Sequence, residues 1–318
     1  MTYYPIIIPT LNRYIHFRRC VESLANNTHA DKTELIIGLD YPPSERYVEG
    51  YKQIKSYIPT IKGFGKVTVF ERTENFGAIK NGSALLEYAF EQYDAIISTE
   101  DDNEFSPCFL DFMNKALNKY MYDDRVSCVE GENNIHYLNL ISTNIMFAPT
   151  GGGRGLGLWK RKRGLLPIED VGSGIEYAHR LIVSWDKSWR IYKMYPGMLK
   201  MLMDMITRGK EIWGDTLIGC CNIVEGLLQL RPRRSMVRNH GYDGSGLHSG
   251  TNPQYMHQIL EYELESAKVF ELDEIEVKCE HVIQKALYWH LLPENKIIAI
   301  FEVLKIAFRY LFLRATKV

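Results

Sequence analysis

Residues 95–102 read A-I-I-S-T-E-D-D, a short apolar strand that ends on three consecutive acids, Glu100, Asp101 and Asp102. Adjacent carboxylates repel one another unless a cation or a polar ligand compensates their charge. A frequent partner of such a run is a divalent metal ion with a nucleotide diphosphate, because the metal bridges carboxylate and phosphate oxygens. The structural alternative is a solvated acidic turn before the helix expected near Pro107, since acids favour helix N-termini.

Short apolar strands and amphipathic helices alternate before this run. Strands are expected at 3–8, 34–39, 66–70 and 94–98, and helices around 17–24, 48–58 and 78–90. Continuous apolar strands between helices predict a mostly parallel sheet covered on both faces, which is an α/β fold. In such sheets ligands bind beyond the carboxyl ends of the strands, where Asp40 and the acids at 100–102 stand.

Composition narrows the class of protein. The 318 residues carry 38 Lys and Arg against 39 Asp and Glu, and this net charge of −1 argues against a dedicated nucleic-acid binder. Hydrophobic residues make up 46% and charged residues 24%, which is typical of a soluble globular chain rather than a disordered one. The six cysteines form no C-x-x-C pair and are expected to be reduced, mostly buried thiols of a cytosolic protein.

Several common motifs are missing from the sequence. The first residues lack a basic segment before their apolar run, so a first strand is expected there and not a signal peptide. The phosphate-binding pattern G-x-x-x-x-G-K-[ST], the dinucleotide pattern G-x-G-x-x-G and the zinc pattern H-E-x-x-H do not occur. Kinases, dinucleotide oxidoreductases and zincin proteases therefore lose support.

The second half of the sequence differs from the first in its pattern of residues. Two glycine-rich stretches, 151–157 and 239–250, are expected to be either plain connections or mobile active-site loops. Residues 297–313 hold fourteen apolar residues and three charges, Glu302, Lys305 and Arg309, on one helix face. A spanning helix needs about 20 apolar residues. This segment is therefore either a helix packed on the domain or an interfacial helix at a membrane.

Four motifs in the first half resemble, in order and spacing, those of the GT-A glycosyltransferases: P-I-I-I-P-T-L-N-R (5–13), L-I-I-G-L-D (35–40), N-F-G-A-I-K-N-G (75–82) and T-E-D-D-N-E-F-S-P (99–107). The acid run is similar to that of the N-acetylglucosaminyltransferases that build complex N-glycans, and to family 2 bacterial enzymes of surface polysaccharides. R-G-L-G-L-W-K-R-K (154–162) resembles a segment of both groups. N-H-G-Y-D-G-S-G-L-H-S-G (239–250) is similar to a stretch of the bacterial enzymes.

This resemblance covers about residues 3–250 and implies a Rossmann-like, mostly parallel sheet flanked by helices. It implies a GT-A catalytic domain over 1–250, with a nucleotide-binding half at 1–130 and an acceptor and donor-sugar half at 131–250. Residues 251–318 are expected to form a C-terminal helical extension.

The resemblance also implies roles for individual residues. Asp40 would accept from the uracil N3–H, and Arg13 would lie near the nucleotide. Asp101 would take the ribose hydroxyls, Glu100 the donor sugar or ribose, and Asp102 the metal, Mn²⁺ or Mg²⁺. The other residues expected at the nucleotide sugar are Pro9, Thr10, Asn12, Asn75, Gly77, Lys80 and Trp159. His240 or His248 would complete the metal shell or hydrogen-bond the phosphates, unless they only order the glycine-rich turn.

An inverting transferase also needs a general base that removes the proton of the acceptor hydroxyl. The N-glycan enzymes carry an Asp in a W-D-D-W segment upstream of a proline-containing strand. Here W-G-D-T (213–216) precedes R-P-R (231–233), which nominates Asp215 although a glycine replaces one acid. Asp186, in W-D-K-S-W (185–189), is the runner-up, and Asp243 is the next candidate.

The sequence thus predicts a metal-dependent, inverting glycosyltransferase, a hexosyl- or N-acetylhexosaminyltransferase. It would move sugar from a nucleotide-diphosphate sugar, with UDP as the preferred nucleotide, to a glycan or lipid-linked glycan in surface polysaccharide synthesis. The enzyme would be cytoplasmic, with residues 297–313 as a contact to the inner face of a membrane. Alternatives are a sugar nucleotidyltransferase, disfavoured by P-T-L-N-R (9–13) after the first strand, and a non-catalytic nucleotide- or glycan-binding relative.

Overall fold

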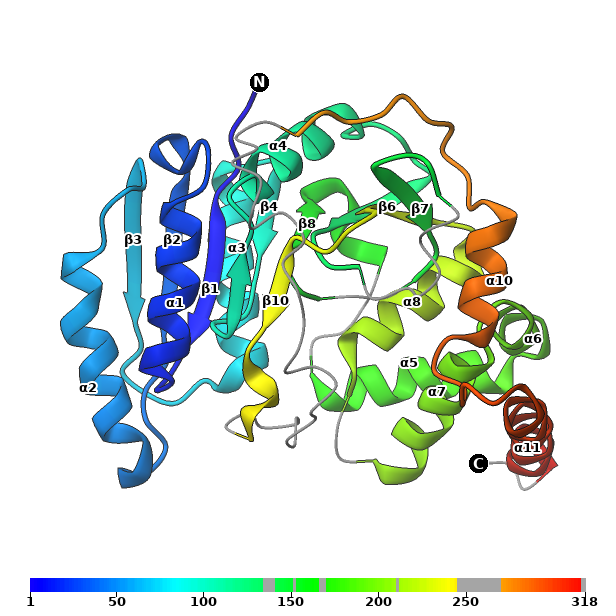
Figure 1. Ribbon diagram of the computed structural model, residues 1–318. Helices are drawn as coiled ribbons and strands as arrows, with labels where there is room; N and C mark the ends of the chain where they lie inside the picture. The colour runs from blue at the N-terminus through cyan, green and yellow to red at the C-terminus, as the bar shows by residue number, and fades with distance from the viewer. Residues whose placement is uncertain (134–140, 151–152, 166–169, 210–211, 245–269, 316–318) are drawn as a thin grey trace.

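The computed structural model describes residues 1–133, 141–150, 153–165, 170–209, 212–244 and 270–315. Its centre is one eight-stranded sheet with the strand order β3-β2-β1-β4-β8-β6-β9-β7 (Figure 1). A separate two-stranded sheet, β10-β5, lies next to it. The α/β class with a mostly parallel sheet flanked by helices, predicted from the sequence, is confirmed.

The first half of the chain builds the parallel part of the sheet. Its strands are β1 Ile6–Thr10, β2 Glu34–Leu39, β3 Lys66–Glu71 and β4 Ala95–Ser98. β1 pairs in parallel with β2 and β4, and β2 pairs in parallel with β3. The intervening helices are α1 Tyr14–Ala25, α2 Val48–Tyr57 and α3 Gly77–Gln92.

Both faces of these strands are buried, which explains their continuous apolar runs. Ile7 of β1 and Ile36 of β2 pack against Leu85 of α3 on one face. Ile6 and Ile8 point to the opposite face, into a core shared with α1 and with α4 Phe109–Lys119. A parallel sheet covered on two sides leaves only its strand ends open to a ligand.

The second half of the chain extends the sheet with mixed strand directions. Its strands are β6 Val126–Glu130, β7 Ile145–Ala148, β8 Leu156–Trp159 and β9 Leu228–Pro232. β8 lies between β4 and β6 and is antiparallel to both, whereas β6 and β9 are parallel.

The position of β8 corrects the expectation for the glycine-rich stretch 151–157, because its last residues form a central strand and not a loop. A Cβ on Gly157 would come within 2.9 Å of Met113 on α4. Gly155 has a φ of +69°, and its Cβ would lie 2.8 Å from the Phe109 ring. These glycines let β8 pack closely against α4.

A layer of helices from the described part of the chain covers the second half of the sheet (Figure 1). They are α5 Val171–Val183, α6 Trp185–Met194, α7 Pro196–Arg208, α8 Gly214–Glu225, α10 His281–Trp289 and α11 Lys296–Ala315. Leu287 of α10 and Ile306 of α11 belong to the same hydrophobic core as Leu199 of α7 and Met146 of β7. The two C-terminal helices therefore share a core with the second half, and the part of the expected extension that α10 and α11 form packs on it.

The small sheet joins two distant parts of the chain. β5 Asn103–Phe105 pairs antiparallel with β10 Val237–Asn239, which brings residue 239 opposite residue 103. The helical turns are η1 Ala30–Lys32, η2 Glu45–Tyr47, η3 Ile58–Thr60, η5 Lys160–Leu165 and η6 Gly241–Asp243. All six cysteines are free thiols, five of them buried. Among the described residues, no helix combines the length and low charge needed to cross a bilayer.

Candidate active site

The three acids lie at the carboxyl edge of the sheet, where β4 and β1 end side by side. Glu100, Asp101 and Asp102 follow β4 after one residue, and Thr10 is the last residue of β1. The Thr10 hydroxyl donates to Asp101 Oδ2 over 2.8 Å. The two strand ends are therefore joined inside the site.

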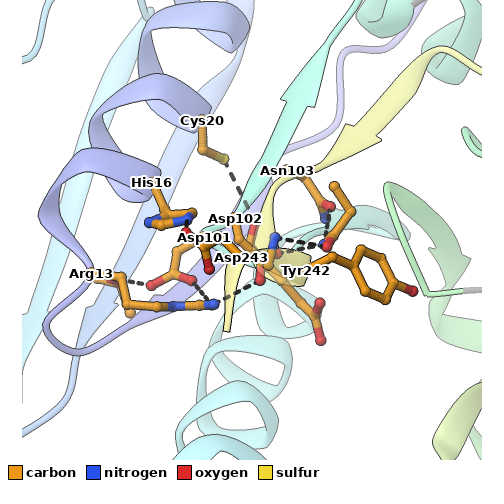
Figure 2. Close-up of polar contacts among 12 residues, drawn as sticks. Arg13, His16, Cys20, Asp101, Asp102, Asn103, Tyr242 and Asp243 are labelled. Atoms are coloured by element: carbon orange, nitrogen blue, oxygen red, sulfur yellow. Dashed lines mark hydrogen bonds and ion pairs between the residues drawn. The ribbon is translucent and has the colours of Figure 1, made fainter. Parts of the chain in front are cut away.

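Arg13 lies between the two buried aspartates. Its Nη1 donates to Asp102 Oδ2 over 2.8 Å and its Nη2 donates to Asp101 Oδ1 (Figure 2). Burial disfavours the charged guanidinium, but the charges of Asp101 and Asp102 outweigh this effect and raise the pKa of Arg13. Two carboxylates from one strand end thus converge on one positive charge.

Glu100 differs from its neighbours because solvent reaches its side chain, whereas Asp101 and Asp102 are buried. The surrounding protein still displaces water from this carboxylate, and together with the charge of Asp102 this raises the pKa of Glu100 to about 7. Arg154 and Arg13 act in the opposite direction. Glu100 is thus the member of the acid run that solvent, and so a ligand, can reach.

Cys20 is the thiol next to this site, with its Sγ 3.6 Å from the Glu100 carbonyl oxygen. Burial, together with the charges of Asp101 and Asp102, raises its pKa well above the usual value. The raised pKa favours the protonated form of this thiol, which is the less nucleophilic one.

The 239–243 segment, which comprises residues Asn239 to Asp243, lies against the acids. Asn239 Nδ2 donates to Asp102 Oδ1 over 2.7 Å. The backbone N–H of His240 donates to the Asp102 carbonyl oxygen over 2.8 Å. A Cβ on Gly241 would lie 2.3 Å from Asp102 Oδ2, so only glycine allows this close approach. The first residues of the second glycine-rich stretch therefore lie directly against Asp102.

The side chains of this segment are held by other elements. His240 Nε2 lies 2.7 Å from Glu104 Oε2, and this hydrogen bond lowers the pKa of Glu104. Asp243 Oδ2 lies 3.0 Å from His16 Nε2 on α1 (Figure 2). His240 therefore points to Glu104, and its role as a metal ligand stays a prediction. His248 lies outside the described residues.

Arg154 is a second guanidinium at this edge of the sheet. The antiparallel registers of β8 with β4 and with β6 place it beside Glu100 on one side and Glu132 on the other. It donates to Glu132 Oε1 and to the Tyr242 hydroxyl. Burial disfavours its charge, but Glu132 and Tyr242 outweigh this effect and raise the pKa of Arg154.

Sequence reasoning missed Asn239, Glu132 and Arg154 as parts of this site, along with His16 and Tyr242. The signal for Asn239 was its place at the start of a glycine-rich stretch, because glycines are needed where backbone approaches another group closely. Its partner could not be read from the sequence, since Asn239 and Asp102 are 137 residues apart.

Asp40 is buried after β2, and its carboxylate organises the start of α3. Oδ1 accepts from the backbone N–H groups of Tyr41 and Phe76, and Oδ2 accepts from Gly77 N and Asn75 Nδ2, over 2.8 to 3.2 Å. The structure thus brings Asp40, Asn75 and Gly77 together, as the shared nucleotide role implies. These contacts occupy the acceptor positions of the carboxylate, so its contact with uracil stays a prediction.

The other residues expected at the nucleotide sugar differ in position. Pro9 lies in β1 opposite Gly38, and Asn12 follows that strand before α1. Lys80 is exposed, with its Nζ 3.9 Å from the centre of the Phe76 ring. Trp159 is 1% exposed, and its indole N–H donates to the Leu117 carbonyl oxygen, so its ring lies in the core and away from the surface.

The two candidate bases lie on different helices. Asp215 is an exposed residue in the first turn of α8, and its Oδ1 accepts from Thr216 N over 2.7 Å. Asp186 lies in the first turn of α6 and pairs with Arg190 over 3.1 Å. Figure 1 shows α6 at the outer edge of the helical layer, well removed from β1 and β4.

Two further observations concern ligands. Within the described residues, no three His, Cys, Asp or Glu side chains come together as metal ligands. A cavity of about 430 Å³ lies between α1 and η3, lined by Tyr14, Arg18 and Tyr57 among others, and none of the predicted donor-site residues lines it. We therefore take the strand ends, and not this cavity, as the candidate active site.

One protein family matches the first half of the chain. Residues 6–158 match the family described as "Glycosyl transferase family 2". The matched range contains β1 to β4, the acid run, Arg13 and Arg154, and it ends in β8. No curated protein sequence matches the chain.

Solved structures give more distant matches. The S. aureus TarS 1–349 structure in complex with UDP is 16% identical with a TM-score of 0.32, covering 42% of this chain and 37% of that one. The mannosyltransferase PcManGT from Pyrobaculum calidifontis, in complex with GDP-Man and Mn²⁺, is 16% identical with a TM-score of 0.40, covering 70% of each chain. The chain spans less than half the length of the TarS chains that it matches.

Proposed function

We propose that this chain, whose residues 6–158 match the family 2 glycosyltransferases, transfers sugar from a nucleotide-sugar donor as a metal-dependent, inverting enzyme. Its donor is a UDP-sugar carrying a hexose or N-acetylhexosamine, and its acceptor is a glycan or lipid-linked glycan of a surface polysaccharide. The observation that carries the proposal is the convergence of Asp101 and Asp102 on one positive charge at the end of β4. That arrangement suits a donor whose diphosphate brings a divalent cation.

A single carboxylate, that of Asp102, is the expected protein ligand of a divalent metal ion such as Mn²⁺ or Mg²⁺. Asp102 offers Oδ2, which Arg13 occupies here, while its Oδ1 is fixed by Asn239. Hard divalent cations prefer carboxylate oxygens, and a ligand held by a second hydrogen bond is oriented for binding. Asp102 would hold the ion together with the diphosphate, and the ion would neutralise negative charge on the leaving group.

The other residues of the site act on the donor itself. Arg13, which lies between the two aspartates, would present its guanidinium to the diphosphate oxygens. Asp101, oriented by Thr10, accepts from the ribose hydroxyls, and the exposed Glu100 accepts from the ribose or donor sugar. Asp40, with Asn75 and Gly77, supports the turn that receives the base.

The acceptor hydroxyl attacks the anomeric carbon on the face opposite the diphosphate, and the bond from that carbon to the diphosphate oxygen breaks to release UDP. The proton of the hydroxyl passes to a carboxylate. We assign that role to Asp215, with Asp186 as the runner-up. A base within hydrogen-bond reach of the hydroxyl is needed as the new bond forms. The exposed position of Asp215 in the first turn of α8 supports the assignment.

The enzyme works in the cytoplasm at the inner face of a membrane. Contact with the membrane through residues 297–313 would bring the active site to a lipid-linked acceptor. The exposed apolar side chains of α11 support this part of the proposal, and the lipid that they recognise is the subject of the next subsection.

Nucleotide binding tests the function directly. UDP with Mn²⁺ is expected to raise the melting temperature of the chain, and UDP without metal, or GDP or CTP with metal, is expected to raise it much less. A ligand at a hundred times its Kd stabilises a protein by about 2.7 kcal/mol. The measurement is a thermal shift with each nucleotide, with and without Mn²⁺. A set of shifts that is the same with and without metal would contradict the metal-dependent mechanism.

Replacing Asn239 with alanine is expected to weaken Mn²⁺ binding in the presence of UDP by about 10- to 100-fold, because Asp102 loses the hydrogen bond that orients it. Calorimetric titration of Mn²⁺ measures the effect. Asn118→Ala is the matched control, since Asn118 bonds to Thr2 in a different part of the fold. Unchanged Mn²⁺ affinity in Asn239→Ala would show that Asp102 is not a ligand or needs no such support.

A further inference from the structure

The outer face of α11 is strongly apolar. Five of its exposed side chains recur at helical spacing along one stripe: Ile297, Phe301, Leu304, Phe308 and Leu311. Phe308 is 77% exposed and Ile297 is 68% exposed. Single exposed apolar residues are normal on a protein, but a contiguous stripe of this kind marks an interaction surface.

This stripe is separate from the face by which α11 packs on the protein. Ala299, Val303, Ile306 and Tyr310 are buried, and the last two belong to the core of the helical layer. With about 3.6 residues per turn, the stripe falls on the opposite side of the helix. The packing of α11 on the domain therefore leaves the stripe facing outward.

The apolar surface continues onto α6. Trp185 is 52% exposed and Trp189 is 42% exposed, and their rings are stacked with centres 6.0 Å apart. α6 is fixed to α11 because Ser188 Oγ and Trp185 both contact Tyr310. An apolar slot of about 80 Å³ lies between the two helices, with Trp189 and Leu311 among its lining residues.

Basic side chains flank this surface. α6 and α11 together carry seven basic and two acidic residues, a net charge of +5, in a chain whose net charge is −1. Arg314 lies over the Trp185 ring at 5.4 Å, and Lys193 lies over the Trp189 ring at 5.6 Å. Lys305 is exposed beside the stripe. Positive charge is thus concentrated where aromatic and aliphatic side chains are exposed.

We propose that α6 and α11 form one docking face for an anionic lipid bilayer, with the stripe of α11 inserted at the headgroup boundary and the two tryptophans beside it. Tryptophan is enriched at membrane interfaces, and basic residues are attracted to anionic headgroups. A second copy of the chain would suit the apolar stripe but would bring two predominantly basic surfaces together. An anionic bilayer matches both the stripe and the charge.

This inference deepens the proposed function, because it names an anionic membrane as the place where the acceptor is met. It also specifies which side of the molecule faces the bilayer. α6 and α11 lie at the far end of the helical layer from β3 and α2 (Figure 1), so the bilayer contacts the second half of the chain and not the nucleotide-binding strands.

The test uses the full chain, because deleting α11 would also uncover core residues that pack against Ile306 and Tyr310. Co-sedimentation is measured with vesicles of phosphatidylcholine alone and of phosphatidylcholine with phosphatidylglycerol. The wild type is expected to bind the anionic vesicles, and more weakly as salt is raised. Phe301→Ser combined with Phe308→Ser is expected to lower the partition coefficient about tenfold or more, since two exposed rings no longer enter the interface.

Lys193→Glu combined with Lys305→Glu is expected to lower binding to anionic vesicles by about tenfold or more, because each basic residue near the surface contributes about fivefold. Tyr122→Ser is the control, since Tyr122 is 86% exposed on a different part of the chain. The shift in melting temperature with UDP and Mn²⁺ is expected to be the same in all variants, which separates this inference from the proposed function.

The proposal would be overturned if the wild type and the phenylalanine variant sedimented equally with anionic vesicles. It would also be overturned if the wild-type protein bound neither kind of vesicle. A stable dimer in light scattering that Phe301→Ser and Phe308→Ser dissociate would assign the face to a second copy instead. Binding that is equally strong on neutral vesicles, and unaffected by the lysine changes, would remove the anionic lipid from the inference.

Discussion

Replacing Asp102 with asparagine is expected to lower the rate of sugar transfer by about 10³ or more. The change keeps the side-chain volume and an oxygen that can accept from Asn239, so the fold and the 239–243 segment are expected to remain. It removes the negative charge that holds a divalent cation. Metal ions contribute several kcal/mol to charge stabilisation in the transition state, and about 1.4 kcal/mol corresponds to tenfold in rate.

Steady-state transfer is measured for Asp102→Asn over a range of Mn²⁺ concentrations, with the melting temperature as the check on folding. Asp123→Asn is the control, because it removes one carboxylate charge at a surface turn, where Asp123 pairs with Arg125. Turnover near that of the wild type at limiting Mn²⁺ would exclude Asp102 as a ligand. An unfolded variant would be followed by Asp102→Glu, which restores the charge and should recover folding but not the rate.

Asp215→Asn is expected to lower kcat by about 10²–10⁴, the usual contribution of a positioned general base. The acceptor hydroxyl must lose its proton as the sugar–phosphate bond breaks, and an amide cannot take it. Binding of UDP and Mn²⁺ is expected to change little, because Asp215 is on α8 and makes none of the contacts of the acid run. Steady-state transfer and calorimetric binding of the same variant separate the two effects.

Asp186→Asn is the matched control for this prediction. Asp186 pairs with Arg190 at the surface of α6, so its loss is expected to cost much less than that of Asp215. An inactive Asp186→Asn beside an active Asp215→Asn would exchange the two assignments. If both variants stayed active, Asp243 would be the next candidate for the general base. Asp243 pairs with His16 at the edge of the acid run.

Much of the first half of the fold could be predicted from the sequence, because its signals are local. The strand expected at 34–39 is β2, and the helix expected at 48–58 is α2 with one residue fewer at its end. Apolar runs of this length, bounded by polar turns, are enough to place buried parallel strands. The acids at 100–102 lie at the strand ends because that edge is fixed by the sheet itself.

The second half could not be predicted in the same way. In the sequence, the stretch that forms β8 looks like a glycine-rich connection. Its glycines are in fact required by the nearby Phe109 and Met113 side chains of α4, and not by the backbone of a turn. Arg231 is one of three arginines at 231–234, a composition typical of a surface, yet it is fully buried and bonds to Gln229. Such assignments depend on packing partners that are far away in the sequence, which no local pattern records.

The pairing of β5 with β10 also determines when the site is completed during folding. Asn239 reaches Asp102 across 137 residues of chain. Contacts of such high sequence separation form late, because the entropy of closing a long loop has to be overcome first. During synthesis the N-terminal strands and the acid run leave the ribosome well before β10 does. We therefore expect the edge with the acid run to be completed late, by the pairing of β10 with β5 after the N-terminal strands have formed.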